Sequence, residues 1–125
     1  MKLRHMNENI ERHIDIKLSF TEIAVDIKNL GSDISILVYG GDKAHIGCTV
    51  ISQPRMSLTG DGTVSVTSSV MNILGHKDEF ICRLLSERCA QNNNCICTCT
   101  GGVHIDNASK EQIEEIISAI ENVDV

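Results

Sequence analysis

The sequence predicts an α+β fold, a mostly antiparallel sheet packed by two C-terminal helices in a single domain. Apolar and polar residues alternate through the first half of the chain, which is the period of strands. The helical period appears only in the second half. The 125 residues suffice for one buried core. We expect a polar N-terminal segment over residues 1–12 and the domain over residues 13–125.

The strands of this sheet are expected first along the chain. Each is a run of alternating or β-favouring residues, and the runs cover residues 14–20, 23–27, 34–38, 46–52 and 63–69. The parity of the apolar positions shifts between the first two runs, which indicates a turn or a bulge. Gly40-Gly41 is expected to end the third run, and Pro54 lies in a loop predicted over residues 53–62.

Two helices and one strand are expected after that loop. The apolar spacing of Phe80, Ile81, Leu84 and Leu85 predicts a helix that begins near Asp78 and Glu79 and ends at Asn92–Asn94. A strand over residues 95–100 is expected to be broken by Gly101-Gly102. The last helix can be capped by Asn107 or Ser109, and its apolar stripe comprises Ile113, Ile116, Ile117 and Ile120.

The overall composition excludes several classes of protein. The net charge is −6 and only 2% of residues are aromatic, which argues against a nucleic-acid surface. No apolar stretch approaches the roughly 20 residues that cross a bilayer. The N-terminal residues lack the apolar run of a signal peptide, so we expect a cytoplasmic protein.

The six cysteines are expected to be reduced thiols and not a disulfide framework. Cys95, Cys97 and Cys99 alternate, so they share one face of a strand. Cys82 and Cys89 lie a heptad apart and share one face of a helix. Their spacing differs from the Cys-x-x-Cys of zinc or iron–sulfur sites, and packing as small apolar groups is the favoured interpretation.

A first glycine- and histidine-rich segment is a candidate anion site. Glycines let the backbone approach a ligand, exposed amides bind anions, and Lys43 and His45 add polar groups. The candidate residues are Gly40, Gly41, Asp42, Lys43, His45 and Gly47. The alternative is a glycine-rich hairpin turn, and the spacing is neither that of a Walker loop nor that of a Rossmann fingerprint.

Two further segments share this character. Ser68 and Ser69, followed by His76 and Lys77, precede the first helix, whose N-terminus suits an anion. The alternative is an ordinary polar helix cap. The third segment joins a strand to the last helix, a usual position for ligand-binding residues, although it could be a plain connection. Its candidate residues are Gly102, His104 and Asp106.

Other chemistry is weakly indicated. The histidines and an aspartate could bind a metal, but they are far apart in the sequence and no i, i+4 pair occurs. No nucleophile motif surrounds any serine or cysteine.

At these same segments the chain resembles the prenylated-flavin chaperone (LpdD-like) family. The matching stretches are Gly40–Gly47, Thr67–Val70 with Gly75–Asp78, and Gly102–Ala108, and the resemblance spans about Gly31 to Ile120. It implies a non-catalytic carrier that binds prenylated FMN and transfers it to a UbiD-type decarboxylase. The family is related in fold to proteasome assembly chaperones, which implies a homodimer. The thiol-rich strand and Cys48 depart from the family's expected pattern.

The resemblance also suggests roles for individual residues. Backbone amides of the first segment and Lys43 would hold the phosphate, and His76 and His104 would meet the isoalloxazine or the ribityl chain. Asp106 would orient His104. Two other functions stay open: an assembly chaperone or interaction module without a ligand, and a small enzyme that acts on a phosphorylated metabolite with His76 or His104 as general acid–base.

Overall fold

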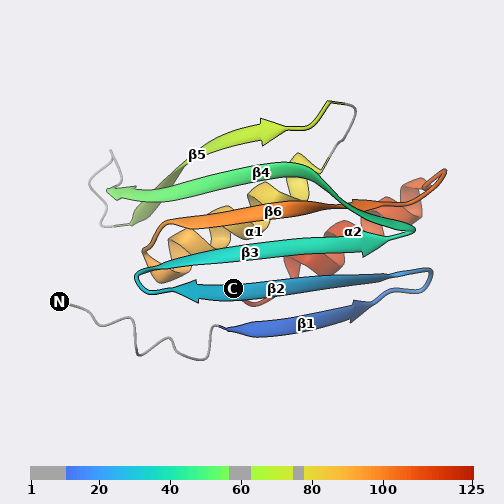
Figure 1. The fold of residues 1–125 in the computed structure, drawn as a ribbon, viewed down its shortest axis with the longest axis horizontal. Coiled ribbons are helices and arrows are strands. Elements are labelled where there is room, and N and C mark those ends of the chain that lie inside the picture. Colours follow the sequence, from blue (N-terminus) through green and yellow to red (C-terminus); the bar gives the residue numbers. More distant parts are fainter. Residues whose placement is uncertain (1–10, 57–62, 75–77) are drawn as a thin grey trace.

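One six-stranded sheet organises the chain (Figure 1). The computed structural model describes residues 11–56, 63–74 and 78–125. The strands are β1 (Arg12–Lys17), β2 (Glu22–Leu30), β3 (Asp33–Gly41), β4 (Lys43–Met56), β5 (Val64–Asn72) and β6 (Cys97–His104). Their spatial order is β1-β2-β3-β6-β4-β5, and only β3 and β6 are parallel. The predicted α+β fold with a mostly antiparallel sheet is therefore confirmed.

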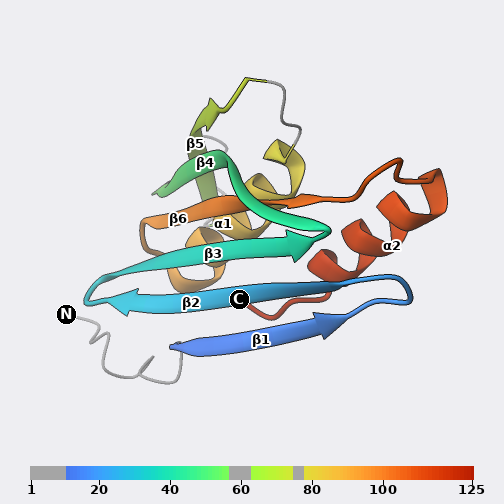
Figure 2. The same cartoon turned by 45° about the vertical axis from the view of Figure 1, so that its right-hand side comes forward.

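Both helices lie on the same side of the sheet (Figure 2). They are α1 (Glu79–Asn93) and α2 (Lys110–Glu121). Asn94 ends α1 in the left-handed conformation, as its place in the predicted Asn92–Asn94 stop suggested. Ser109 begins α2 with a capping box, in which its hydroxyl accepts the N–H of Gln112 at 3.1 Å.

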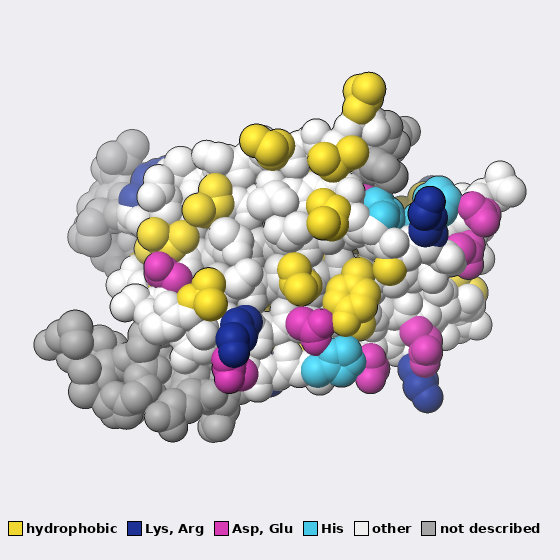
Figure 3. Space-filling model, in the orientation of Figure 1, with side chains coloured by type: hydrophobic (Ala, Val, Ile, Leu, Met, Phe, Trp, Pro, Cys, Tyr) yellow, Lys and Arg dark blue, Asp and Glu magenta, His cyan; other side chains and the backbone are white. Residues whose placement is uncertain are grey.

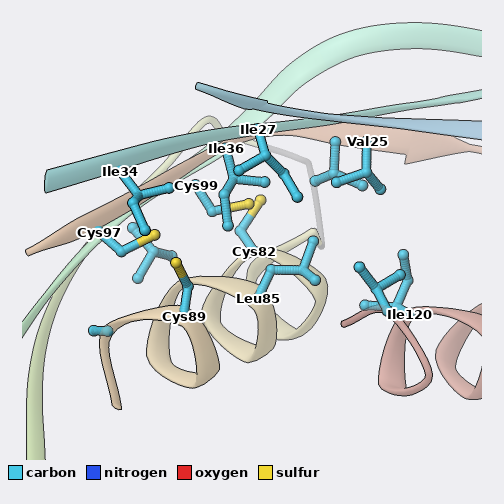
Figure 4. Packing of buried hydrophobic residues seen from close by; sticks show 14 of the residues in the cluster. Val25, Ile27, Ile34, Ile36, Cys82, Leu85, Cys89, Cys97, Cys99 and Ile120 are labelled. Atoms are coloured by element: carbon cyan, nitrogen blue, oxygen red, sulfur yellow. The ribbon is translucent and has the colours of Figure 1, made fainter. Parts of the chain in front are cut away.

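The core fills the layer between sheet and helices and contains all six cysteines as buried thiols that form no disulfide. In Figure 4, Cys82 and Cys89 of α1 point toward Cys99 and Cys97 of β6. Burial raises the pKa of Cys48 to about 12, which keeps its thiol protonated and unreactive. The predicted packing of the thiols as small apolar groups is confirmed.

The predicted loop after residue 52 is wrong in part, because β4 continues to Met56. Pro54 lies within this strand, opposite Val66 of β5. The pairing of β4 with β6 ends at Ser52, so Pro54 occupies a stretch that has a neighbour on one side only. A proline is tolerated there because its missing N–H interrupts no second ladder.

The predicted break at Gly101-Gly102 is also wrong, because β6 runs from Cys97 through both glycines to His104. Gly101 has a φ of +148° beside Val38 of β3, and a Cβ there would collide with the Val38 carbonyl. The glycine thus permits close strand pairing instead of ending the strand. Cys95, predicted to begin this strand, lies before it.

The other side of the sheet, the open face, carries no helix in the described part of the chain (Figure 1), and Figure 3 shows the side chains on this face. Its central strands bear uncharged side chains, among them Leu37 of β3 and Ile51 of β4, which are 46% and 44% exposed. Charges lie toward β1 and β2, where His13 bridges Asp15 and Asp26, and Tyr39 donates to Asp26 at 2.7 Å.

Candidate functional site

The ends of β3, β4 and β6 bring together nine of the predicted site residues. Gly41 pairs with His104 across β3 and β6, and Lys43 pairs with the same histidine across β4 and β6. The two segments separated by about sixty residues in the chain thus become neighbours. The nine residues are Gly40, Gly41, Asp42, Lys43, His45, Gly47, Gly102, His104 and Asp106.

A buried histidine–carboxylate pair lies at the centre of this region. His45 Nε2 is 2.9 Å from Asp78 Oδ2, and their side chains are only 12% and 7% exposed. The other oxygen of Asp78 accepts the backbone N–H of Val103 at 3.0 Å. His45 Nδ1 lies 3.2 Å from the Lys43 carbonyl. Asp78 therefore joins β4, β6 and the start of α1 through one carboxylate.

Two glycines make the space that this pair occupies. A Cβ on Gly102 would lie 2.6 Å from His45 Nε2 and 2.7 Å from Asp78 Oδ2. A Cβ on Gly47 would collide with the Asp78 carboxylate. The β4–β6 register shifts between Ala44 and Cys48, and this bulge carries His45 and Gly47. We call Gly47 and Gly102 the glycine seat of the pair.

Gly40 and Gly41 serve the main chain instead. Gly40 has a φ of +150°, and a Cβ there would lie 2.5 Å from the Glu22 carbonyl of β2. Gly41 has a φ of +83°, and a Cβ would collide with the His104 carbonyl. Close packing of neighbouring strands accounts for both glycines; their contact with a ligand stays a prediction.

A second, exposed histidine–aspartate pair lies at the same end of the sheet. His104 Nε2 is 2.9 Å from Asp106 Oδ1, as expected if Asp106 orients the ring. The side chains of His104 and Asp106 are 48% and 74% exposed. Asp42 holds the main chain around this pair in place. Its N–H donates to the His104 carbonyl at 2.7 Å, and its carboxylate accepts the Asp106 N–H at 2.9 Å. The rings of His45 and His104 meet edge to face, with centroids 6.3 Å apart.

A groove of about 620 Å³ opens beside the two histidines. We name it the α1–α2 groove. Asp78, His45 and His104 are its polar lining, and the remaining lining is apolar. The apolar residues come from α1, the end of β6, the β6–α2 connection and α2, and they are Phe80, Ile81, Val103, Ile105, Ala108, Ile113, Ile116 and Ile117. Its size and mixed lining are those of a small-molecule site.

The second predicted segment does not join this groove as far as it is described. Ser68 bonds Ser52 and Glu87 at 2.8 and 2.6 Å under the middle of α1. Ser69 is exposed and pairs with Ile51 of β4. Neither serine lines the groove. His76 and Lys77 lie outside the described residues, so their predicted roles stay predictions.

Sequence reasoning missed Asp78 and the apolar wall as parts of the site. The sequence assigns Asp78 to the first helical turn, a role that its position before α1 also suits, yet its side chain does not cap the helix. In the predicted stripe of α2, Ile116 and Ile120 are buried and Ile113 is 46% exposed, and all of the stripe except Ile120 lines the groove. Within the described residues, no three His, Cys, Asp or Glu side chains are grouped to hold a metal.

A solved structure shares this fold. The structure resembles a chain in the crystal structure of a chaperone complex for yeast 20S proteasome assembly, with a TM-score of 0.51 over 88% of both chains. Identity with that chain is 16%, so the likeness concerns the fold. No curated protein matches the chain significantly.

The family follows from the sequence match. The model of the prenylated flavin chaperone LpdD-like domain matches residues 18–124, and the chain belongs to this family. Its role is therefore that of a non-catalytic chaperone, and the resemblance found in the sequence is confirmed. No helix of the described residues is long and apolar enough to cross a membrane.

Proposed function

We propose that the chain carries prenylated FMN in the α1–α2 groove and transfers it to a UbiD-type decarboxylase. The observation that carries this proposal is an apolar groove with two histidines at one end, beside the ends of β3, β4 and β6, in a chain of the prenylated flavin chaperone family. A volume of about 620 Å³ lies within the range of sites for small organic ligands.

The groove suits the ring system of this ligand. A flavin extended by a prenyl-derived ring is flat and largely apolar, and its heteroatoms lie along one edge. Phe80 and Ile117 would pack against the apolar part, because burial of apolar area is favourable. His104, which is half exposed, would meet the polar edge, and Asp106 would hold its ring.

The phosphate would lie outside the apolar wall, near Lys43. This exposed lysine pairs with His104 across β4 and β6, so its charge lies at the same end of the sheet as the groove histidines. A lysine ammonium binds phosphate as a point charge. The bulge between Ala44 and Cys48 would add backbone amides to this contact.

An open site agrees with a carrier that must release its ligand. Ile113 is 46% and Phe80 is 55% exposed at the groove, so a bound ring would keep one side accessible to the receiving enzyme. We further propose that the carrier is a homodimer and that the transfer takes place in the cytoplasm.

A matched pair of substitutions tests the groove. Ile113→Glu places a charge at the groove wall, and Leu30→Glu places the same charge at the end of β2. The two side chains are 46% and 57% exposed, so neither change should impair folding. Binding of prenylated FMN, measured by flavin fluorescence, should weaken at least about tenfold in Ile113→Glu only. Equal binding by both variants would place the ligand elsewhere.

A further inference from the structure

One edge of the sheet lacks the usual protection against pairing. β5 is an edge strand, and β4 is its one neighbour among the described strands (Figure 1). Its nine residues, VSVTSSVMN, include no charge and no proline. The opposite edge strand, β1, is RHIDIK and carries charge along its length. Natural sheets protect exposed edges with charges and prolines, and β5 has neither.

Within the described residues, the outer main-chain groups of β5 have almost no hydrogen-bond partner. Alternate residues of an antiparallel strand direct their N–H and C=O away from the neighbouring strand. Among the described residues, one side chain reaches the β5 main chain: Gln91 Nε2 donates to the Val64 carbonyl at 3.0 Å. The described part of the chain makes no such contact between Ser65 and Asn72. This edge can therefore accept another strand.

The middle of β5, Val66–Val70, reads VTSSV and is nearly symmetric about Ser68. Pairing with an antiparallel copy of itself, centred on Ser68, places Val66 opposite Val70 of the partner subunit. Both valines are partly buried on the helix-covered side, so this pair extends the core. On the open face the same register places Thr67 opposite Ser69 of the partner subunit.

The charged side chains of α1 nearest this edge are paired with one another. Glu87 of α1 accepts the Ser68 hydroxyl at the centre of the strand and is paired with Arg83 at 3.2 Å. Arg83 also pairs with Glu79, which accepts the Asn72 amide at 3.0 Å. The two glutamates near the edge thus share one arginine on the same helix, which leaves this cluster with one net negative charge in each subunit.

We propose that β5 is the self-association edge of the chain, where a second copy adds its own β5 antiparallel about Ser68 and joins the two sheets into one. The occupant is a copy of the chain because the main-chain groups require a strand and the symmetric pattern fits that strand. This inference rests on the homodimer in the proposed function and not on its ligand.

Charge substitutions test the edge and its register together. In the proposed dimer, Thr67→Lys with Ser69→Lys places two lysine pairs directly opposite each other, and the glutamate double variant does the same with acids. The dissociation constant, measured by analytical ultracentrifugation, should rise at least about tenfold in each variant. An equimolar mixture should form the heterodimer, because each lysine then faces a glutamate.

Two control variants distinguish the effect of charge at the β5 edge from loss of the hydroxyls and from charge elsewhere on the sheet. The valine double variant at Thr67 and Ser69 removes the same hydroxyls, including the one that accepts from Arg55 at 2.8 Å, yet adds no charge and should dimerise. Leu37→Lys charges the centre of the open face on β3, and it should dimerise as well.

Four results would overturn the inference, and flavin binding separates it from the carrier proposal. If the wild-type chain is a monomer, the proposed edge contact does not form. If Leu37→Lys is a monomer, the dimer interface lies on the open face. Lysine and glutamate variants that dimerise alone exclude β5, and failure of their mixture excludes the register about Ser68. A monomer that binds prenylated FMN leaves the carrier proposal intact, whereas a β5 dimer that binds no flavin contradicts the carrier proposal alone.

Discussion

Gly102→Ala should disrupt the His45–Asp78 pair without straining the backbone. The new Cβ would lie 2.6 Å from His45 Nε2 and 2.7 Å from Asp78 Oδ2, where real contacts need well over 3 Å. One of the two side chains must move, which breaks a 2.9 Å hydrogen bond between groups that are 12% and 7% exposed. Overpacking and a lost buried partner each cost about 1–3 kcal/mol, and we expect a total near 3 kcal/mol.

Urea unfolding of the variant measures this cost. Gly31→Ala is the control, because a Cβ there meets nothing within 4 Å and only its φ of +73° is unfavourable, a cost of about 1 kcal/mol. Flavin binding should also weaken in Gly102→Ala, since His45 lines the groove. If Gly102→Ala lost less stability than Gly31→Ala and bound flavin normally, the glycine seat would have no such role.

Three further predictions follow from the core and the open face. Gly101→Ala should prevent folding, because its Cβ would press into the β3 main chain at a φ of +148°; a folded variant by circular dichroism would contradict this. The native thiols should resist a thiol reagent until urea unfolds the chain, since all are buried and the pKa of Cys48 is about 12; rapid native labelling would contradict it. Hydrogen bonds to Asp26 and then Asp15 raise the pKa of His13, so its stabilisation is complete below the ordinary value of about 6.5 and is lost as the pH rises through the raised value. The stability gap between wild type and His13→Ala should therefore close at alkaline pH, and a gap that widens there would refute the pairing.

The strands were predictable because their signal is local. Alternation between buried and exposed positions, as in Ile34, Ile36 and Val38, follows from one helix-covered face and can be read from the chain alone. The caps of both helices are equally local, because Ser109 and Asn94 act within their own turns. These patterns were almost sufficient to predict the fold class.

The glycines of β6 could not be interpreted from the chain alone. Gly101 is required by the Val38 carbonyl, and Gly102 by His45, whose positions only the folded sheet reveals. From the sequence alone, two adjacent glycines predict a break in a strand, because the residues that lie beside them in the folded sheet are not known.

The place of Asp78 in the site could not be predicted from the sequence for a related reason. A carboxylate at the start of a helix has an ordinary local explanation in the helix dipole. Its partners, His45 and the Val103 N–H, come from strands 33 and 25 residues away. The apolar wall of the groove could not be predicted either, because Ile113 belongs to the same apolar stripe as the buried Ile116.

The most direct test of the central claim is the visible absorbance and mass spectrum of the protein purified after co-expression with a flavin prenyltransferase. No amino-acid side chain absorbs visible light, so visible absorbance would come from a bound ligand. The account predicts a coloured protein that releases prenylated FMN on denaturation, and a colourless Ile113→Glu variant. A colourless wild-type protein with no bound flavin mass would contradict the carrier function and leave the groove without its proposed ligand.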